Sequence, residues 1–213
     1  MTKFLSIFLL VGLLGQAAAD EQAPITGMLG AYYTDANVNN KGAAPNGEGH
    51  ARGLVGELGK GWLYGYFQYE EPSFDLKLAP GVKERVEAEE LRLGVGARKR
   101  FQRGQAFIGV ERFSQKLKFQ SLPADGSDFG IGVHAGGDYM VTLLADKFPL
   151  VVFGDLGAFQ LKHSNAKEVR VGLKTMLTPN LGAMVSYRRF EQDLDDEPDM
   201  TLTGPMVGIA WIF

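Results

Sequence analysis

Apolar and polar side chains alternate strictly along three long stretches of the chain. In residues 88–98, Leu91 and Leu93 alternate with Glu90 and Arg92. The other two stretches are residues 128–141 and 168–177. Successive side chains of a β-strand point to opposite faces, so a period of two predicts strands whose two faces meet unlike environments. A helix would require apolar residues three and four positions apart, which these stretches lack.

Weaker alternation marks seven further stretches, which bring the number of predicted strands to ten. They cover residues 25–34, 50–59, 62–70, 105–118, 149–161, 181–190 and 201–213. The connections between the ten alternate between short turns and longer polar loops. Short turns are expected at residues 59–61, 100–104, 145–149 and 178–180, and long loops at 35–49, 71–87, 120–127 and 192–200, with 163–166 as a short exception.

The alternation of short turns and long loops predicts an all-β fold, an up-and-down antiparallel transmembrane β-barrel of about ten strands. Strand boundaries read from a sequence carry errors of about 2–4 residues, so eight strands is the alternative. A second alternative places the apolar faces in a soluble core, which would give a barrel or sandwich free in the periplasm.

The first 19 residues have the features of a secretory signal peptide. Lys3 is their only charged residue, Phe4 to Leu14 are almost wholly apolar, and Ala17-Ala18-Ala19 are small. A basic start, an apolar middle and a small-residue end are what signal peptidase requires. The apolar stretch is too short to span a bilayer core of about 30 Å. We therefore expect residues 1–19 to be removed during export and residues 20–213 to form one domain.

Composition excludes several classes of function. The 213 residues contain no cysteine, which excludes disulfide scaffolds, thiolate zinc sites, iron–sulfur clusters and thiol nucleophiles. A formal charge of −3 disfavours a general nucleic-acid binder. We expect no nucleic-acid partner, no cofactor and no metal ion.

The last stretch of the chain carries Val207, Ile209, Trp211 and Phe213 on one face. It resembles the C-terminal assembly signal of bacterial outer-membrane β-barrel proteins, in which alternating apolar residues lead to a terminal Phe. The resemblance implies residence in the outer membrane, recognition by the barrel-assembly machinery, and contact with membrane lipid and lipopolysaccharide. The expected state is a monomer.

Aromatic residues near the ends of the strands predict two girdles at the membrane boundaries. The periplasmic girdle would contain Phe101, Phe148, Trp211 and Phe213, and the outer one Tyr32, Tyr33, Tyr66 and Tyr69.

Strand parity places many charged residues inside the barrel. The predicted lumen charge network consists of Glu90, Arg92, Arg98, His134, Asp138, Arg170, Lys174 and Arg188, with Glu57, Glu111 and Asp155 added from less regular strands. Barrels of this size are narrow, and an unpaired buried charge is costly, so balanced charges are expected to pair and fill the lumen. A thin polar path for small solutes is the alternative.

One tetrad suggests an enzyme. Residues 163–166, His-Ser-Asn-Ala, are similar to the His-x-Ser-Asn segment of outer-membrane lipid A deacylases, in which histidine activates serine. In this chain His163 and Ser164 are adjacent, so a regular strand would point them to opposite faces. Glu168 is the candidate to orient the histidine.

The sequence matches a second family of outer-membrane enzymes even less well. Outer-membrane aspartyl proteases use paired aspartates and an Asp–His couple. Asp193, Asp195 and Asp196 supply acids near a loop, but the sequence contains no Asp-x-His. We therefore expect a non-enzymatic barrel with a structural or surface-interaction role. A narrow channel and a lipid A-modifying enzyme are the alternatives.

Overall fold

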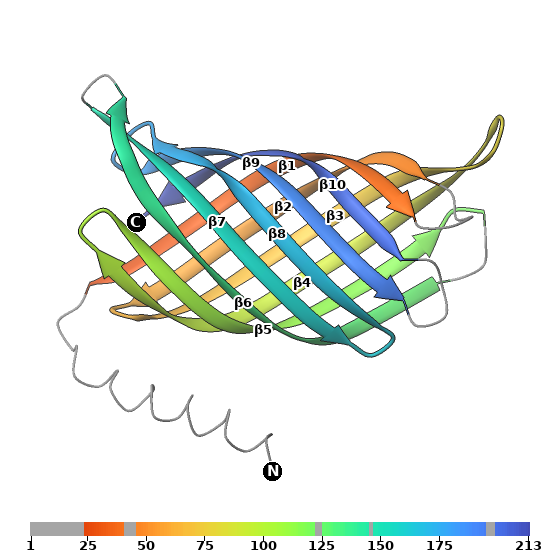
Figure 1. Ribbon diagram of the computed structural model, residues 1–213, viewed down its shortest axis with the longest axis horizontal. Coiled ribbons are helices and arrows are strands. Elements are labelled where there is room, and N and C mark those ends of the chain that lie inside the picture. The colour runs from red at the N-terminus through yellow and green to blue at the C-terminus, as the bar shows by residue number, and fades with distance from the viewer. Residues whose placement is uncertain (1–23, 41–45, 122–124, 145–146, 195–198) are drawn as a thin grey trace, which may run out of the picture.

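The computed structural model describes residues 24–40, 46–121, 125–144, 147–194 and 199–213. These residues form one closed antiparallel barrel of ten strands (Figure 1). The prediction of about ten strands in up-and-down order is confirmed, and the alternative of eight is wrong. The predicted signal peptide, residues 1–19, lies outside the described residues.

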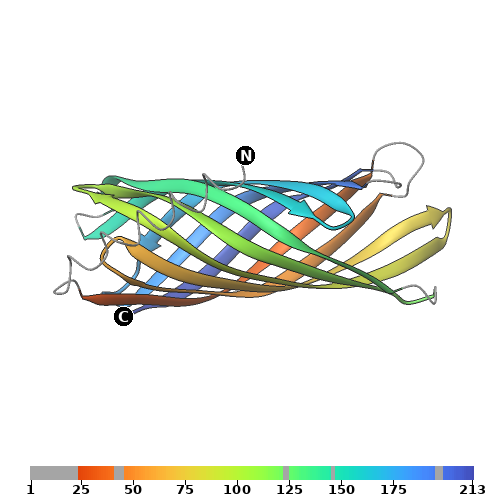
Figure 2. The ribbon, with the colours of Figure 1, turned by 90° about the horizontal axis from the view of Figure 1, so that it is seen from below.

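Each strand pairs with the next, and β1 pairs with β10 to close the barrel. The strands are β1 Ile25–Asn40, β2 Gly47–Lys60, β3 Leu63–Ala79, β4 Val82–Phe101, β5 Gly104–Phe119, β6 Asp125–Leu144, β7 Phe148–Leu161, β8 Ser164–Met176, β9 Leu181–Leu194 and β10 Met200–Ile212. At the seam, Gly27 and Phe213 exchange two backbone hydrogen bonds of 2.7 and 3.0 Å. We call the end where β1 begins and β10 finishes the terminal end, and the opposite end the loop end (Figures 1 and 2).

The strands extend further toward the loop end than the sequence pattern predicts. The expected loop at 71–87 is almost entirely strand, and only Pro80 and Gly81 connect β3 to β4. Gly81 has a φ of 79°, a conformation that a residue without Cβ adopts at no steric cost. The resulting hairpin projects beyond its neighbours at the loop end (Figures 1 and 2).

The cause of this difference is an exchange of polarity between the two faces of the wall. On β1, Leu29 and Tyr33 point outward in the terminal half. In the loop half, Asp35 points outward while Ala36 and Val38 are buried inside. The alternation of two therefore continues through the predicted loops, but its apolar face changes from the outside to the inside.

The inside of the loop half is an apolar core, which we call the apolar plug. It consists of Ala36, Val38, Phe74, Phe113, Phe159, Leu161, Ala166, Phe190 and Leu202. Its members come from seven strands and are at most 7% exposed, so the plug fills the barrel from wall to wall as a soluble core would.

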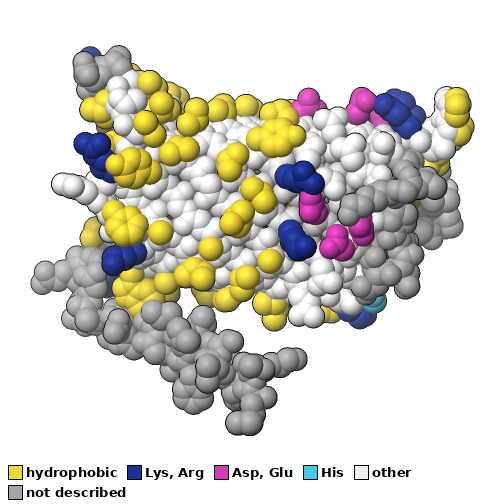
Figure 3. All heavy atoms as spheres, viewed as in Figure 1, with side chains coloured by type: hydrophobic (Ala, Val, Ile, Leu, Met, Phe, Trp, Pro, Cys, Tyr) yellow, Lys and Arg dark blue, Asp and Glu magenta, His cyan; other side chains and the backbone are white. Residues whose placement is uncertain are grey.

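The outside of the terminal half carries a band of exposed apolar side chains, which we call the apolar belt. It includes Leu29, Leu54, Leu58, Leu91, Leu93, Val95, Ile108, Ile131, Val133, Val152, Leu156, Val169, Val171, Leu173, Val185, Val207 and Ile209. Figure 3 shows apolar side chains over this half, Asp and Glu side chains toward the loop end, and Lys and Arg side chains at both ends.

The predicted aromatic girdles are partly correct. At the terminal end, the side chains of Phe101, Phe148, Trp211 and Phe213 are all exposed. At the other edge of the belt, Tyr33 and Tyr69 point outward. Tyr32 and Tyr66 do not belong to a girdle, because their parity directs them into the lumen.

The β1–β10 seam yields a test of barrel closure. A Cβ at Gly204 would lie 1.7 Å from the carbonyl oxygen of Asp35, whereas a Cβ at Gly154 would come no closer than 3.6 Å to any atom. We expect Gly204→Ala to lower the free energy of unfolding by about 1–3 kcal/mol, because the seam must shift to admit the methyl group. Gly154→Ala should change it by less than about 0.5 kcal/mol. Urea unfolding followed by tryptophan fluorescence measures both, and equal effects would contradict this packing.

Candidate functional site

Five charged side chains meet at the level where the wall changes polarity. We call Glu70, Glu90, Arg92, Glu168 and Arg188 the ion cluster. Arg188 lies 2.6 Å from Glu70, 3.2 Å from Glu168 and 3.7 Å from Glu90. Arg92 lies 2.7 Å from Glu168 and 3.9 Å from Glu90. All five side chains are at most 7% exposed, so the cluster is a buried network that joins β3, β4, β8 and β9 across the lumen.

The ion cluster is covered on its loop side by aromatic rings of the apolar plug. The Cζ atom of Arg92 lies 5.0 Å from the ring centre of Phe113, 4.9 Å from that of Phe159 and 5.8 Å from that of Phe190. A guanidinium over aromatic faces gains cation–π attraction, which is strongest where water is excluded. The three rings therefore stabilise the guanidinium of Arg92 and also fill the lumen.

Amides and a phenol complete the surroundings of the cluster. Gln115 donates a hydrogen bond of 3.1 Å to Glu90. Gln68 donates to the hydroxyl of Tyr32 at 2.8 Å and to Glu70 at 3.4 Å. These partners satisfy part of the hydrogen-bonding capacity that burial of three carboxylates demands.

A second polar group lies toward the terminal end. The imidazole of His134 lies between two phenols, with Nε2 2.7 Å from the Tyr64 hydroxyl and Nδ1 2.9 Å from the Tyr66 hydroxyl. Tyr66 donates to Glu111. The tautomer that fits this network carries its proton on Nδ1, donates to Tyr66 and accepts from Tyr64.

Three more ion pairs line the terminal half of the lumen. They are Arg98 with Glu57, Lys174 with Asp138 at 2.5 Å, and Arg170 with Asp155 at 3.0 Å. Lys174 is 42% exposed and Arg170 21% exposed, in contrast to the ion cluster. Arg98 is 5% exposed, so the greater accessibility belongs to the Lys174 and Arg170 pairs and not to the whole terminal half.

All eight residues predicted for the lumen charge network face the lumen, but they do not form one network. Glu90, Arg92 and Arg188 belong to the ion cluster, His134 belongs to the tyrosine group, and Arg98, Asp138, Arg170 and Lys174 belong to the separate pairs. Glu57, Glu111 and Asp155 also face inward.

Sequence reasoning missed two carboxylates of the ion cluster. Glu168 lies on the polar face of the regular stretch 168–177 but was considered only as a partner of His163. Glu70 ends a weakly alternating stretch, and it shares parity with Tyr64 and Gln68. Parity alone would have placed both inside the barrel.

The tetrad 163–166 does not form a catalytic pair in this structure. The Ser164 hydroxyl is buried, donates to Asp128 at 2.7 Å and accepts from Gln192 at 2.9 Å. His163 is exposed on the turn before β8, and Glu168 is engaged by two arginines.

The acids near the last connection form no recognisable site either. Asp193 is exposed at the end of β9, and Asp195 and Asp196 lie outside the described residues. Within the described ranges, no three His, Asp or Glu side chains converge as metal ligands.

The predicted assembly signal lies along the outward face of β10. Val207, Ile209, Trp211 and Phe213 are each more than half exposed. Phe213 lies across the backbone of Gly27, so the last residue also covers the start of the seam.

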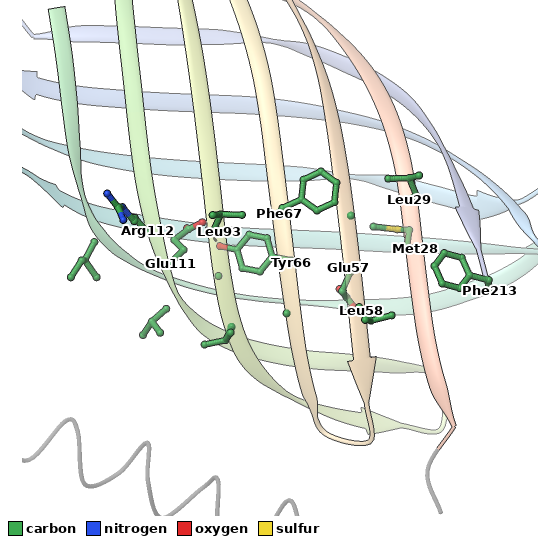
Figure 4. Close-up of a pocket in the computed structure, with 16 residues that line it drawn as sticks. Met28, Leu29, Glu57, Leu58, Tyr66, Phe67, Leu93, Glu111, Arg112 and Phe213 are labelled. Atoms are coloured by element: carbon green, nitrogen blue, oxygen red, sulfur yellow. Dashed lines mark hydrogen bonds between the residues drawn. The ribbon is translucent and has the colours of Figure 1, made fainter.

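The outer wall carries an apolar hollow of about 1000 Å³. Figure 4 shows its labelled lining residues in a row across the strands, with Arg112 and Phe213 at the two ends. Leu58, Phe67 and Leu93 contribute outward apolar side chains. The hollow arises where Gly65 leaves the wall bare, because a Cβ there would meet no atom within 3.6 Å.

The outer wall of the loop half carries exposed ion pairs. They are Arg52 with Glu71, Lys77 with Glu48, Arg85 with Glu87, and Lys118 with Glu89. The hydrogen bond from Lys77 lowers the pKa of Glu48. Exposed pairs contribute little to stability, so this face is a solvated surface.

Neither a protein-family model nor a curated protein matches the sequence. Solved structures with a similar fold are outer-membrane β-barrels. Neisserial surface protein A has 12% identity and a TM-score of 0.47, covering 87% of this chain and 96% of its own. The β domain of the Bordetella autotransporter BrkA has 11% identity and a TM-score of 0.49, covering 87% and 98%. The outer membrane protease OmpT of Escherichia coli has 10% identity and a TM-score of 0.42, covering 89% and 96%. All three TM-scores lie below 0.5, so these likenesses assign no function to this chain.

The described residues contain no helix with the length and apolar character needed to span a membrane.

The ion cluster yields a test of its contribution to stability. Arg188→Leu leaves three buried carboxylates short of a partner and should lower the free energy of unfolding by about 3–5 kcal/mol. Arg189→Leu changes the neighbouring residue, which points outward and pairs with Glu191 on the exposed surface. Arg189→Leu should lower the free energy of unfolding by less than about 1 kcal/mol. The measurement is urea unfolding of each folded variant, and similar losses in both would refute a central role for Arg188.

Proposed function

We propose that this protein is an integral outer-membrane β-barrel with a closed lumen and a structural or surface-interaction role. The observation that carries the proposal is the exchange of polarity along the wall, with an apolar belt outside one half and an apolar plug inside the other. A barrel with this distribution is stable with its terminal half in lipid and its loop half in water.

The apolar belt supports a location in a bilayer. Large apolar side chains cover the outward face of the terminal half, and most are 40–70% exposed. Soluble monomers rarely expose a contiguous apolar patch of more than a few hundred Å². Hydrocarbon around the belt removes this cost, which favours the membrane protein over the soluble barrel.

The apolar plug supports a closed lumen. Phe113, Phe159 and Phe190 are at most 3% exposed, and their ring centres lie 5.3 to 6.4 Å apart. A polar solute entering from the terminal end would have to lose its hydration to pass these rings. This favours the plugged barrel over the narrow channel.

The position of Ser164 disfavours the lipid A-modifying alternative. A serine nucleophile must be within hydrogen-bond reach of its base. The Ser164 hydroxyl is occupied by Asp128 and Gln192, and His163 is exposed on the turn before β8.

The projecting β3–β4 hairpin supports a surface-interaction role. Leu78 and Val82 are each 51% exposed beside its tip, and Lys77 and Lys83 flank them. Lys77 pairs with Glu48 and Lys83 with Asp75, so such a tip offers a partner outside the membrane an apolar contact framed by ion pairs.

The remaining parts of the proposal concern biogenesis. Residues 1–19 would direct export to the periplasm, and the outward row on β10 would be read by the barrel-assembly machinery. The folded protein would then be a monomer surrounded by membrane lipid and lipopolysaccharide.

The location in lipid is tested by two lysines placed on one face of β8. Val171→Lys puts a charge in the apolar belt and should destabilise the bilayer-embedded protein by about 2–4 kcal/mol. Asn165→Lys puts the same charge on the same strand face in the loop half, where a change below about 0.5 kcal/mol is expected. Urea unfolding in phospholipid vesicles gives both values. Recovery of the wild-type protein in the soluble fraction without detergent would reject the membrane location.

The closed lumen is tested in planar bilayers. The wild-type protein should give no discrete conductance steps, and the double variant Phe113→Ala/Phe190→Ala should give them, because it removes two rings from the plug. The control double variant Phe101→Ala/Phe129→Ala removes two exposed outward rings and should remain silent. Discrete wild-type steps that disappear on exchange of lumen charges would establish the channel instead.

A further inference from the structure

Arg112 is a cation in apolar surroundings. It points outward from β5, opposite Leu93 on β4 and Ile131 on β6, which are 51% and 70% exposed. In the described part of the chain, no carboxylate forms an ion pair with Arg112. A charged side chain on the lipid face is destabilising, most strongly at the bilayer midplane and less near the interface. A phosphate bound to the guanidinium removes that destabilisation, because arginine and phosphate form paired charge-assisted hydrogen bonds.

The polar stripe on β5 begins deeper in the belt than on the neighbouring strands. The outward residues of β5 become polar at Arg112 and Ser114. The residues opposite Ser114 are Leu91 and Phe129, which still belong to the apolar surface. Arg112 therefore places a positive charge at the edge of the apolar belt, where a lipid headgroup would meet its acyl chains.

The apolar hollow lies beside Arg112. Arg112 is the only charged side chain in its lining that points outward, because Glu57 and Glu111 point into the lumen. The lining extends from Leu29 on β1 to Ile131 on β6, which is broad enough for several alkyl chains side by side. Its volume of about 1000 Å³ is at the upper end of the range of small-molecule sites.

A polar hollow of about 260 Å³ lies next to the apolar one, on the same strands and the same face. Arg52, Glu71, Glu89 and Lys116 line it, each four residues toward the loop end from a residue that lines the apolar hollow. Four residues of strand span about 13 Å. Three ion pairs line the polar hollow, Arg52 with Glu71, Arg85 with Glu87 and Lys118 with Glu89. Lys116 is the cation of this lining that has no ion pair among the described residues. The polar hollow therefore suits a head that combines phosphate with sugar hydroxyls.

We propose that the two hollows and Arg112 form one binding site for a phosphorylated glycolipid of the outer leaflet, with several acyl chains, of the lipid A class. The acyl chains occupy the apolar hollow over Gly65, a phosphate binds Arg112, and the sugar head extends toward Lys116. This inference rests on the proposed function, because it requires the belt to lie in the outer membrane.

The test is native mass spectrometry of the full folded protein, titrated with diphosphoryl lipid A in detergent micelles. The wild type should retain one lipid A molecule. Arg112→Gln should weaken binding at least tenfold, because the phosphate loses its cation. Gly65→Leu should weaken it similarly, because the new side chain fills the hollow without clashing with the wall. Removal of both phosphates from lipid A should weaken binding to the wild type and have little further effect on Arg112→Gln.

Two variants serve as controls. Lys99→Gln makes the same change of charge on the outward face at the terminal end of β4, and Gly154→Leu adds the same side chain to an open glycine on β7. Both should bind lipid A as the wild type does. The heat-dependent shift in gel mobility of each variant confirms that its barrel is folded.

Three results would overturn the proposal. They are unchanged lipid A binding by Arg112→Gln and Gly65→Leu, equally tight binding of phosphatidylglycerol, and a protein dimer that displaces lipid from the hollow. If the site fails while the Val171→Lys and Asn165→Lys pair behaves as expected, the membrane barrel stands and only the glycolipid site is refuted.

Discussion

A closed β-barrel offers each side chain only two environments, the lumen and the outside, and the rest of this structure depends on how those environments change along the wall. In the terminal half, Leu93 and Val171 point outward while Arg98 and Arg170 point inward. In the loop half the faces are reversed, with charged side chains outside and phenylalanines inside. One backbone architecture thus combines an apolar exterior in one half with an apolar interior in the other, because a closed barrel satisfies its backbone hydrogen bonds whichever environment surrounds it.

The ion cluster lies where these two halves meet. Arg188 and Arg92 are held by carboxylates from three other positions and covered by the rings of the plug. A buried ion pair adds little net stability compared with apolar packing, but the loss of one partner is expensive. The cluster therefore specifies how β3, β4, β8 and β9 face one another across the lumen more than it adds to the total stability. The plug then isolates it from water on the loop side, while the pairs formed by Arg170 and Lys174 in the terminal half are more accessible.

On the outward surface, too, the pairing of charged side chains differs between the two halves. In the loop half, most charged side chains have an opposite charge beside them, as Arg52 has Glu71. Arg112 interrupts an otherwise apolar surface and has no such partner among the described residues. An unpaired cation next to a hydrophobic hollow is costly in isolation and favourable with an anionic amphiphile, which is the physical basis of the proposed glycolipid site.

The sequence by itself determined the up-and-down β-barrel of about ten strands, their order and the parity of the terminal half, because alternation of two is a local property of an extended chain. The closed structure settled the number at ten and not eight. The sequence also directed residues such as Arg92 and Arg188 to the interior. The tertiary structure decided the rest. Which charges pair depends on the stagger of strands around the barrel, which brings Arg188 to Glu70 although 118 positions separate them. The strand ends at 35–40 and 71–79 were misjudged as loops because their apolar face is the inner one, and only the closed barrel reveals that face as a core. The apolar hollow likewise results from neighbours on six strands, so no single stretch of sequence contains it.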